Sequence, residues 1–127
     1  MKILVLDDER DIVDVCVEFL NLHDYEADGI LMTKNISEED IFARLKSQGT
    51  EILISDQNMV GIKGTELFRC IREKPEYQKL KLILHTSEPS YELREEVLRC
   101  GGQGFLSKPI KPLALLAAVK AVCAQTA

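Results

Sequence analysis

Apolar runs of this 127-residue chain stop at polar residues whose types suit phosphate and cation chemistry. The stretch ILVLDD ends in Asp7 and Asp8, and the stretch ILISD ends in Asp56. Thr86 follows LKLILH, and Lys108 follows the short run FL after one serine. Carboxylates bind hard cations, while ammonium and hydroxyl groups can contact phosphoryl oxygens. These side chains could therefore serve one site if the fold brings the ends of the runs together.

Taken one at a time, the same residues have ordinary structural interpretations. These are helix N-caps at Asp7-Asp8 and Thr86-Ser87, an Asx turn at Asp56 and a surface turn at Lys108-Pro109. Independent caps and turns would have no reason to collect carboxylates, a hydroxyl and an ammonium at the strand ends of one sheet. Their joint placement favours a functional site.

Short apolar runs alternate with longer amphipathic segments, which is typical of parallel strands joined by crossover helices. The expected strands are 3–6, 27–31, 52–54, 80–84 and 105–106. The first, third and fourth are apolar almost throughout, as strands covered on both faces must be. We expect these to form the centre of the sheet.

Five helices are expected, at about 11–23, 37–48, 64–74, 91–100 and 112–124. Ser37 is a candidate N-cap, Gly49 a stop signal and Pro112 a first-turn residue. The chain contains no linker or repeat, so residues 1–127 are expected to form one domain. The pattern predicts a doubly wound α/β fold in which the carboxyl ends of the strands share one edge, where ligands of such folds bind.

Carboxylates crowded at that edge would repel one another, at about 4 kcal/mol per pair for a 4 Å separation and an effective dielectric near 20. A hard divalent cation would relieve the repulsion, and Mg²⁺ fits best because it binds through one or two carboxylates and a phosphate oxygen. One carboxylate could then attack phosphorus and form an aspartyl phosphate. Lys108 would compensate charge, and Thr86 could donate its hydroxyl once a phosphoryl group is present.

The overall composition argues against several other classes of protein. The chain has 16 Lys and Arg against 21 Asp and Glu, a net charge of -5, and no long basic run, so direct nucleic-acid binding is not expected. The start MKILVLDDER has too few apolar residues for a signal peptide or a membrane span. A cytoplasmic location without membrane contact is expected.

The cysteines follow no metal-site or redox spacing. They are Cys16, Cys70, Cys100 and Cys123, without a C-x-x-C pair. Each falls in a helix-like segment beside apolar residues, so we expect reduced cysteines in the core.

With these features identified, the sequence resembles the receiver domain of two-component response regulators over essentially its whole length. The stretches that carry the resemblance are LVLDDER, ISDQNMVGIKG, LHTSE and CGGQGFLSKPI. The resemblance implies a flavodoxin-like five-stranded parallel sheet in the order 2-1-3-4-5 with five helices. It also implies a signalling phosphoacceptor, similar to the chemotaxis regulator, that is not an enzyme beyond catalysing its own phosphorylation and dephosphorylation.

The resemblance implies roles for individual residues. Asp56 would be the phosphoacceptor, Asp8 a direct Mg²⁺ ligand, Asp7 an acidic partner acting through water and Asn58 a ligand through its backbone carbonyl. Thr86 would be the switch hydroxyl, Phe105 the switch aromatic and Lys108 the phosphate-contacting lysine. The family also has a cis bond at the position of Lys108-Pro109.

The sequence departs from the family pattern near the site. Val60 stands where proline is usual and Ser87 where alanine is common, so loop rigidity and access to the phosphoryl group are expected to differ. Asn58 and Glu88 occupy positions that tune phosphoryl lifetime in the family. Their similarity to the chemotaxis regulator implies a short-lived signal.

The resemblance implies a histidine kinase or histidine phosphotransfer protein as phosphoryl donor. A downstream protein, or a second copy, would bind the fourth helix, fifth strand and fifth helix. The segment KPLALLAAVKAVCAQTA offers an Ala-rich surface, which suits either a partner or an ordinary exposed helix. No DNA-binding or catalytic segment follows Ala124, so output through protein contact is expected, and a stand-alone chain and a piece of a larger protein both stay open.

Two other interpretations are open to test. A Mg²⁺-dependent phosphatase of the haloacid dehalogenase type also forms an aspartyl phosphate, but it needs D-x-D where this chain has Asp7-Asp8-Glu9. A receiver-like scaffold that is never phosphorylated would be expected to lack an acidic or lysine position, and none is missing.

Overall fold

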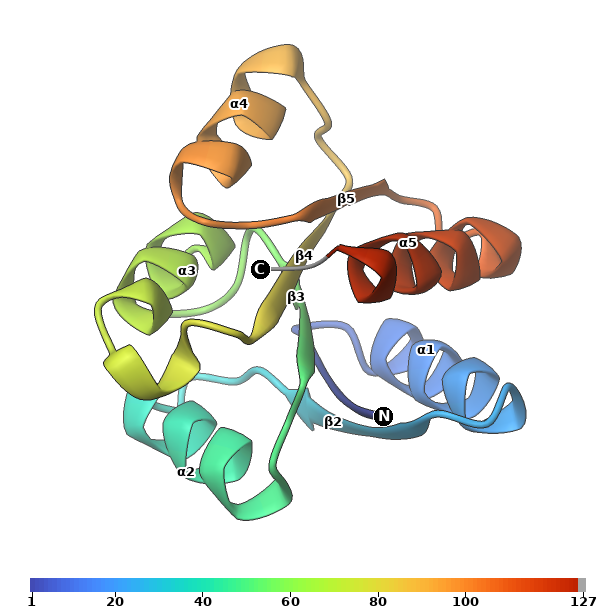
Figure 1. The fold of residues 1–127 in the computed structure, drawn as a ribbon, viewed down its shortest axis with the longest axis horizontal. Coiled ribbons are helices and arrows are strands. Elements are labelled where there is room, and N and C mark those ends of the chain that lie inside the picture. The colour runs from blue at the N-terminus through green and yellow to red at the C-terminus, as the bar shows by residue number, and fades with distance from the viewer. Residues whose placement is uncertain (126–127) are drawn as a thin grey trace.

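The computed structural model describes residues 1–125 as a five-stranded sheet with helices on both faces (Figure 1). The strands are β1 Lys2–Asp7, β2 Glu26–Leu31, β3 Ile52–Asp56, β4 Lys81–Thr86 and β5 Gly104–Ser107. The helices are α1 Arg10–Leu22, α2 Glu38–Gln48, α3 Gly64–Arg72, α4 Tyr91–Arg99 and α5 Pro112–Ala124, and a short 3-10 helix spans Pro75–Tyr77.

All strands pair in parallel in the order β2-β1-β3-β4-β5, which confirms the predicted fold class and strand order. The three inner strands are the ones predicted to be central. Every residue of β3 is buried, and β1 and β4 are buried except at their first residue. Strands covered on both faces need this nearly continuous apolar sequence.

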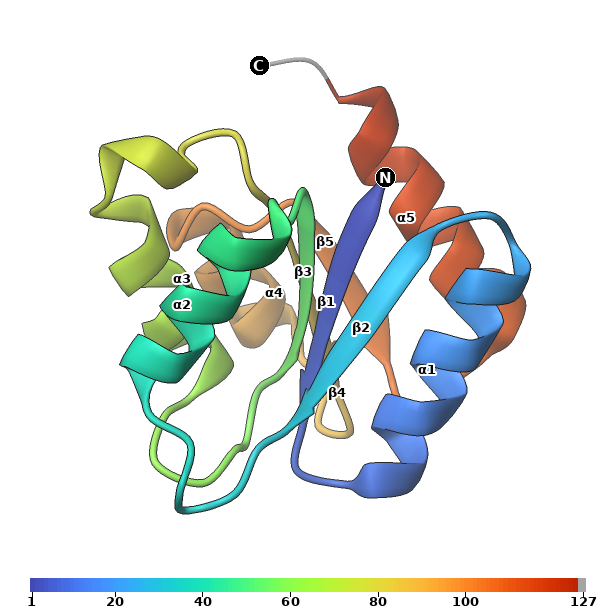
Figure 2. The same cartoon turned by 90° about the horizontal axis from the view of Figure 1, so that it is seen from below.

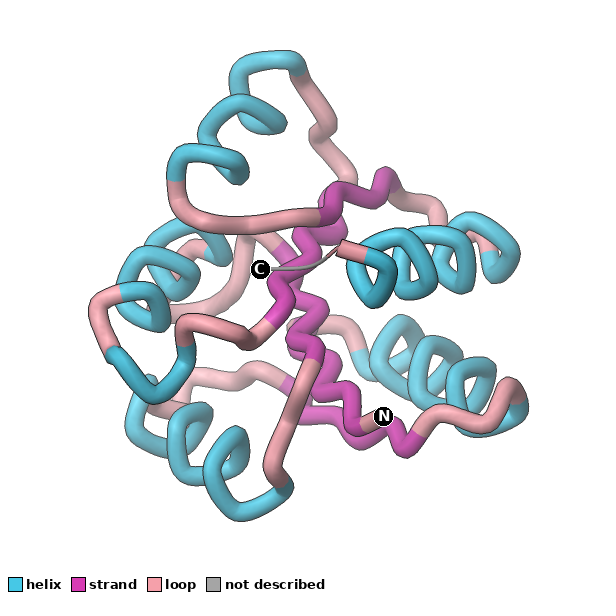
Figure 3. The backbone as a smooth tube through the Cα atoms, in the orientation of Figure 1, coloured by secondary structure: helices cyan, strands magenta, loops and turns pink. Residues whose placement is uncertain are grey.

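Two helical layers enclose the sheet, and Figure 3 shows the strands as the layer between them. Helices α1 and α5 cover one face, where Val5, Ile54 and Val119 are in the same buried cluster. Helices α2, α3 and α4 cover the other face, where Leu84 and Phe68 belong to a second buried cluster. Each fully buried Leu, Ile or Phe contributes about 1.5–3 kcal/mol relative to exposure, so the two layers hold the strand ends in fixed positions.

The carboxyl ends of the strands lie together at the lower edge of the molecule in Figure 2, and the chain ends lie toward the opposite edge. This arrangement follows from right-handed crossovers between parallel strands. The loops that leave the carboxyl edge carry the predicted site residues or begin directly after them, except for Phe105, which lies within β5.

Several element boundaries differ from the sequence prediction. Asp7, Asp56 and Thr86 were expected just after their strands, but each is the last residue of its strand. Ladder hydrogen bonding to neighbouring strands extends these strands beyond their apolar residues. The 3-10 helix at Pro75–Tyr77 was not predicted, because Pro75 was read only as the end of a helix.

The helix signals acted largely as predicted. Ser37 caps α2, since its hydroxyl accepts from the Asp40 N–H at 3.2 Å and the Asp40 carboxylate accepts from the Ser37 N–H at 2.9 Å. Gly49 ends α2 at a φ of 60°. In α5, Leu115, Val119 and Val122 face the core, and the alanine positions 114, 117 and 121 are exposed.

The outer side of the edge strand β2 is partly paired by a side chain. Asn21, at the end of α1, accepts a hydrogen bond from the Ala27 N–H at 2.8 Å and donates one to the Ala27 carbonyl at 3.2 Å. The amide side chain thus takes the place that a further strand would occupy at this residue.

The cysteine prediction is correct in part. All four cysteines are free, and Cys16 and Cys100 are buried as expected. Cys70 is only partly buried and Cys123 is exposed, so these two are not core residues. The exposed position of Cys123 lies on the turn of α5 that leaves the sheet, where apolar neighbours in sequence do not guarantee burial.

Candidate functional site

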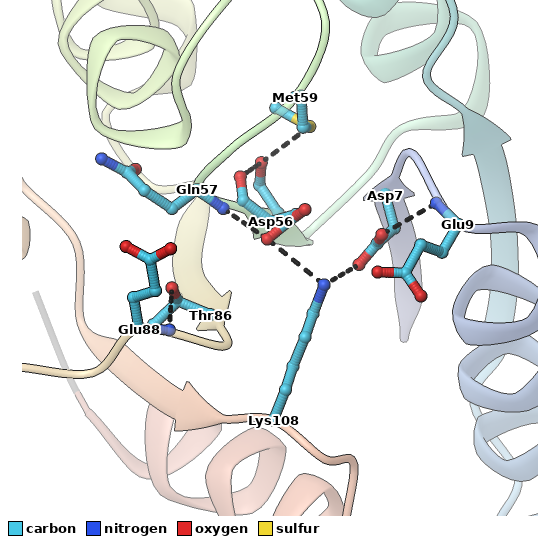
Figure 4. Close-up of polar contacts among 9 residues, drawn as sticks. Asp7, Glu9, Asp56, Gln57, Met59, Thr86, Glu88 and Lys108 are labelled. Atoms are coloured by element: carbon cyan, nitrogen blue, oxygen red, sulfur yellow. Dashed lines mark hydrogen bonds and ion pairs between the residues drawn. The ribbon is translucent and has the colours of Figure 1, made fainter.

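The strand ends bring the predicted side chains into one cluster, and Figure 4 shows Asp7, Asp56 and Lys108 pointing toward one another. Strand pairing sets this arrangement: Leu6 pairs with Ser55, so the next residues along, Asp7 and Asp56, leave neighbouring strands side by side. Their side chains lie on the α1 and α5 side of the sheet, because they continue the alternation of Val5 and Ile54. The fold therefore supplies two adjacent carboxylates without help from the loops.

Lys108 joins the two carboxylates from the far side of β4. Its Nζ lies 3.0 Å from Asp7 Oδ2 and 3.3 Å from Asp56 Oδ1, and its side chain is only 8% exposed. The Lys108 backbone N–H donates to the Thr86 carbonyl at 2.7 Å, which fixes the start of the side chain beside β4. The Lys108-Pro109 bond is cis, as the family resemblance implied.

The cluster contains more negative than positive charge. One carboxylate oxygen each from Asp7, Asp8 and Asp56 lies within 4.8 Å of the others. Asp7 and Asp56 are buried and Asp8 is exposed. Three carboxylates facing one ammonium leave two negative charges uncompensated, the charge that one divalent cation would balance, and oxygen donors suit a hard cation. The residues present therefore fit a metal ion of this kind.

The protonation of Asp56 reflects this crowding. Burial and then the charge on Asp7 raise the pKa of the Asp56 carboxyl, Lys108 opposes both, and the resulting pKa is about 6. For Lys108, burial alone lowers the pKa, but the hydrogen bonds and attraction from Asp7 and Asp56 outweigh it and the pKa is raised. The lysine therefore stays charged near pH 7. The Asp56 carboxyl has a pKa only slightly below neutral pH, and a bound cation would favour its ionised form.

Backbone groups as well as the lysine orient the carboxylates of Asp7 and Asp56. The Glu9 N–H donates to Asp7 Oδ1 at 3.0 Å, and the Gln57 N–H donates to Asp56 Oδ1 at 2.8 Å. Hydrogen bonds to an ionised carboxylate are stronger than those between neutral groups. The carboxylates are consequently fixed in direction before any ligand arrives.

The two predicted switch residues lie beside the cluster on different elements. Thr86 is fully buried, and its hydroxyl accepts from the Glu88 N–H at 3.1 Å. Phe105 is partly buried against the α2, α3 and α4 layer, and the Arg94 guanidinium stacks over its ring at 4.8 Å. Asn58 is exposed and forms an isolated bridge with Lys63 in the β3–α3 connection, so its role as a carbonyl ligand stays a prediction.

The sequence was compared with models of known protein families. The model of the response regulator receiver domain matches residues 3–120. This chain belongs to the response regulator receiver domain family. Receiver domains are signalling domains of two-component systems that interact with kinases and with downstream targets.

Relatives of this receiver domain differ in total length. The "14.6 kDa protein in sodA1 3'region" of Leptolyngbya boryana is 32% identical over 123 residues, which is 97% of this chain and 90% of that protein. The phosphate regulon transcriptional regulatory protein PhoB of Rhizobium meliloti is 29% identical over 95% of this chain, but the match spans only 51% of PhoB.

The receiver domain is similar in structure to a chemotaxis regulator. The chemotaxis protein CheY4 of Vibrio cholerae superimposes with a TM-score of 0.84 at 26% identity, over 95% of this chain and 97% of CheY4. Within residues 1–125, none of the helices of this receiver domain is both long and apolar enough to cross a membrane.

Buried polar residues of the receiver domain that sequence reasoning did not assign lie close to the cluster. Gln57 and Thr65 are buried together under the β3–α3 connection. His85 is buried in β4, where burial and then the charge on Lys108 lower its pKa to about 4, so it is neutral near pH 7. The only sequence signal for Gln57 was a polar residue directly after Asp56, at a position that continues a buried strand.

Proposed function

We propose that this receiver domain accepts a phosphoryl group on Asp56 in a Mg²⁺-dependent reaction and uses it to switch a protein-binding surface. The observation that carries the proposal is the buried Lys108 ammonium between Asp7 and Asp56, within a cluster of carboxylates. Such a cluster has little structural benefit, because it collects like charges in a poorly solvated place. Its electrostatics suit a phosphoryl group held between a cation and an ammonium.

In the proposed reaction, a carboxylate oxygen of Asp56 attacks the phosphorus of a phosphohistidine on a histidine kinase or histidine phosphotransfer protein. An oxygen–phosphorus bond forms, and the nitrogen–phosphorus bond breaks with its electron pair going to the imidazole, which takes up a proton. Lys108 then contacts a phosphoryl oxygen in place of its contact with Asp56.

Asp8, Asp7, Asp56 and the carbonyl of Asn58 would hold the magnesium ion. When bound, Mg²⁺ supplies charge neutralisation for the phosphoryl oxygens. The residues of the chain do the rest: Gln57 N–H and Lys108 hold the acceptor carboxylate, and Glu9 N–H holds Asp7. Asp8 is the exposed carboxylate of the cluster, so the phosphoryl donor would approach from its side.

For the switch, we propose that the Thr86 hydroxyl leaves the Glu88 N–H and donates to a phosphoryl oxygen. Movement of Thr86 frees space that Phe105 can fill, which couples the site to α4, β5 and α5. A coupling free energy of about 1–3 kcal/mol is enough to shift such an equilibrium. A downstream protein or a second copy would bind this surface, and the domain, residues 1–127, would work in the cytoplasm without contacting nucleic acid or membrane.

The proposal is tested by treating the purified protein with acetyl phosphate, with Mg²⁺ or with a chelator, and measuring intact mass. The native chain and Asp14→Ala, a control at an exposed acid on α1, should gain one phosphoryl group only with Mg²⁺. Asp56→Ala should gain none. An adduct that persists in Asp56→Ala would place the acceptor elsewhere, and no adduct in any sample would favour a scaffold that is never phosphorylated.

The switch is tested separately from the chemistry. Thr86→Ala should still take up the phosphoryl group, but phosphorylation should no longer change hydrogen exchange in α4 and β5. If exchange in these elements responds to phosphorylation as strongly in Thr86→Ala as in the native chain, Thr86 does not connect the site to this surface.

A further inference from the structure

A polar clamp closes the loop that follows the acceptor aspartate. The β3–α3 connection leaves Asp56 and returns to α3 at Gly64, whose N–H donates to the Gln57 carbonyl at 2.9 Å. The Gln57 side chain, which is buried, donates from Nε2 to the Thr65 hydroxyl at 3.1 Å and accepts at Oε1 from the Thr65 N–H at 3.0 Å. Gln57 is thereby joined to the first turn of α3 by three hydrogen bonds.

The clamp supplies a hydrogen-bond acceptor for the backbone N–H of Thr65, which has no acceptor within α3. Thr65 lies in the first turn, where backbone N–H groups have no partner within the helix. The N-cap position is held by Lys63, whose ammonium cannot accept a hydrogen bond, and Glu66 accepts only from the Lys63 N–H at 3.3 Å. Gln57 therefore caps α3 from the end of β3, with both of its amide groups used and both partners buried.

The same residue holds the acceptor carboxylate. The Gln57 N–H donates to Asp56 Oδ1 at 2.8 Å, the oxygen that Lys108 also contacts. Figure 4 shows the Gln57 side chain directed away from Asp56 and Lys108. One peptide thus points its N–H at the acceptor while its side chain is fixed to α3, so the direction of that N–H depends on the clamp.

The close approach of α3 strengthens this coupling. A Cβ added at Gly64 would lie 2.6 Å from the Asp56 carbonyl oxygen and 3.2 Å from Gln57 Oε1. No side chain fits between the first turn of α3 and the end of β3. A shift of α3 would therefore be transmitted to the backbone of Asp56 directly.

On these grounds we infer that Gln57, through its paired hydrogen bonds to Thr65, is a positioning residue that sets the reactive geometry of Asp56. The inference rests on the proposed function, since it concerns the rate at which Asp56 takes up and releases a phosphoryl group. An apolar pair in the same place would fill the space, but it would not fix the direction of the Gln57 peptide, because only hydrogen bonds are directional.

The test compares uptake from acetyl phosphate and subsequent hydrolysis in a series of variants. Gln57→Leu keeps the approximate volume but removes both side-chain hydrogen bonds, and uptake should slow by about tenfold, as for other small displacements of reacting groups. Thr65→Val removes only the hydroxyl and should slow uptake by about threefold, the loss expected for one hydrogen bond. Thr65→Ser restores the hydroxyl and should restore the native rate.

A matched control separates positioning from stability. Ile52→Val loses a buried methyl group at the other end of β3 and lowers stability without touching the clamp. Its uptake and hydrolysis rates should equal those of the native chain. If Ile52→Val slows uptake as much as Thr65→Val at equal loss of stability, or if Gln57→Leu reacts at the native rate, the inference is wrong.

A measurement without phosphorylation keeps this result distinct from failure of the proposed function. In nuclear magnetic resonance spectra, the Gln57 side-chain amide protons should exchange slowly with solvent in the native chain and in Thr65→Ser, and faster in Thr65→Val. Equal exchange in all three would overturn the clamp itself. Slow exchange together with a native chain that gains no phosphoryl group would overturn both the proposed function and the positioning role.

Discussion

The β3–α3 and β4–α4 connections leave neighbouring strands of the sheet, yet they are held very differently. After β3, Gln57 is buried and hydrogen-bonded to Thr65, and α3 buries five of its nine residues. After β4, residues 87–90 are all exposed, and α4 buries only Val97 among its nine. The surroundings of Asp56 are therefore held by many more contacts than the region that follows β4.

The contacts of Thr86 and Phe105, the proposed switch residues, belong to this less firmly held region. The Thr86 hydroxyl is bonded to the Glu88 N–H within its own loop, and Phe105 is held from outside by Arg94. Neither contact is a hydrogen bond or ion pair to a core residue. Rigidity beside Asp56 and freedom in α4 are what a switch driven by chemistry at one place and read at another requires.

The largest expected difference between the two regions is in the free energy of unfolding that is lost when a side chain is truncated to alanine. Phe68→Ala, at a fully buried position of α3, should lower the free energy of unfolding by about 3–5 kcal/mol. Leu98→Ala, at a position of α4 that is 58% exposed, should change it by less than about 0.5 kcal/mol. Urea denaturation followed by circular dichroism measures both, and equal losses would remove the contrast.

Magnesium should act on the acidic cluster and leave α4 unchanged. At a concentration of one hundred times its dissociation constant, Mg²⁺ should stabilise the folded protein by about 2.7 kcal/mol. Asp8→Ala should lose most of this gain, because Asp8 is the exposed carboxylate of the cluster, while Leu98→Ala should keep all of it. Thermal unfolding with and without Mg²⁺ measures the effect, and a full gain in Asp8→Ala would place the ion elsewhere.

In the absence of metal, ionisation of Asp56 should lower the free energy of unfolding. Its pKa is raised from 3.8 to about 6, so the folded protein binds this proton more tightly than the unfolded chain does. This group's contribution to stability therefore falls as pH rises from about 4 to about 6, and the cost at pH 7 is about 1–3 kcal/mol.

Asp56→Asn should accordingly raise the free energy of unfolding at pH 7 and reduce its fall between pH 4 and pH 6. Denaturation in the presence of a chelator at several pH values measures this, with Asp14→Asn on the exposed face of α1 as the control. A less stable Asp56→Asn at pH 7 would mean that the attraction to Lys108 outweighs burial and the repulsion from Asp7.

The smallest expected effect concerns the contact between Arg94 and Phe105. Arg94→Met removes the cation but keeps an unbranched side chain over the ring, and should cost about 0.5–1 kcal/mol. The same change should speed hydrogen exchange at the start of α4 without altering exchange in α3. A loss comparable to that of Phe68→Ala would show that this region is more firmly packed than its burial indicates.

Much of the fold and the centre of the site could be predicted from the sequence. The nearly unbroken apolar runs identified β1, β3 and β4 as the inner strands, and parallel pairing then required Asp7 and Asp56 to lie together. Lys108 could be assigned to the same edge because it follows the fifth predicted strand, and the family resemblance added its role as the phosphate-contacting lysine. The structure adds that its Nζ lies between the two carboxylates.

The remaining features depend on contacts that no local pattern encodes. The pairing of Gln57 with Thr65 needs the starting angle of α3, which the loop between them sets. The exposure of Cys123 depends on where α5 leaves the sheet, although its neighbours in sequence are apolar. Strand ends at Asp7 and Thr86 were missed because backbone pairing extends past the last apolar side chain.

The amide of Asn21 against Ala27 has a consequence for self-association. An open outer strand normally invites a strand from another molecule, but here the backbone donor and acceptor of Ala27, the second residue of β2, are already occupied. The next residue, Asp28, forms an ion pair between its Oδ2 and Arg44 Nη1 at 2.8 Å, which adds charged groups to the same border. Pairing of a strand from another molecule with β2 is thereby hindered, so association of copies through this border of the sheet is disfavoured.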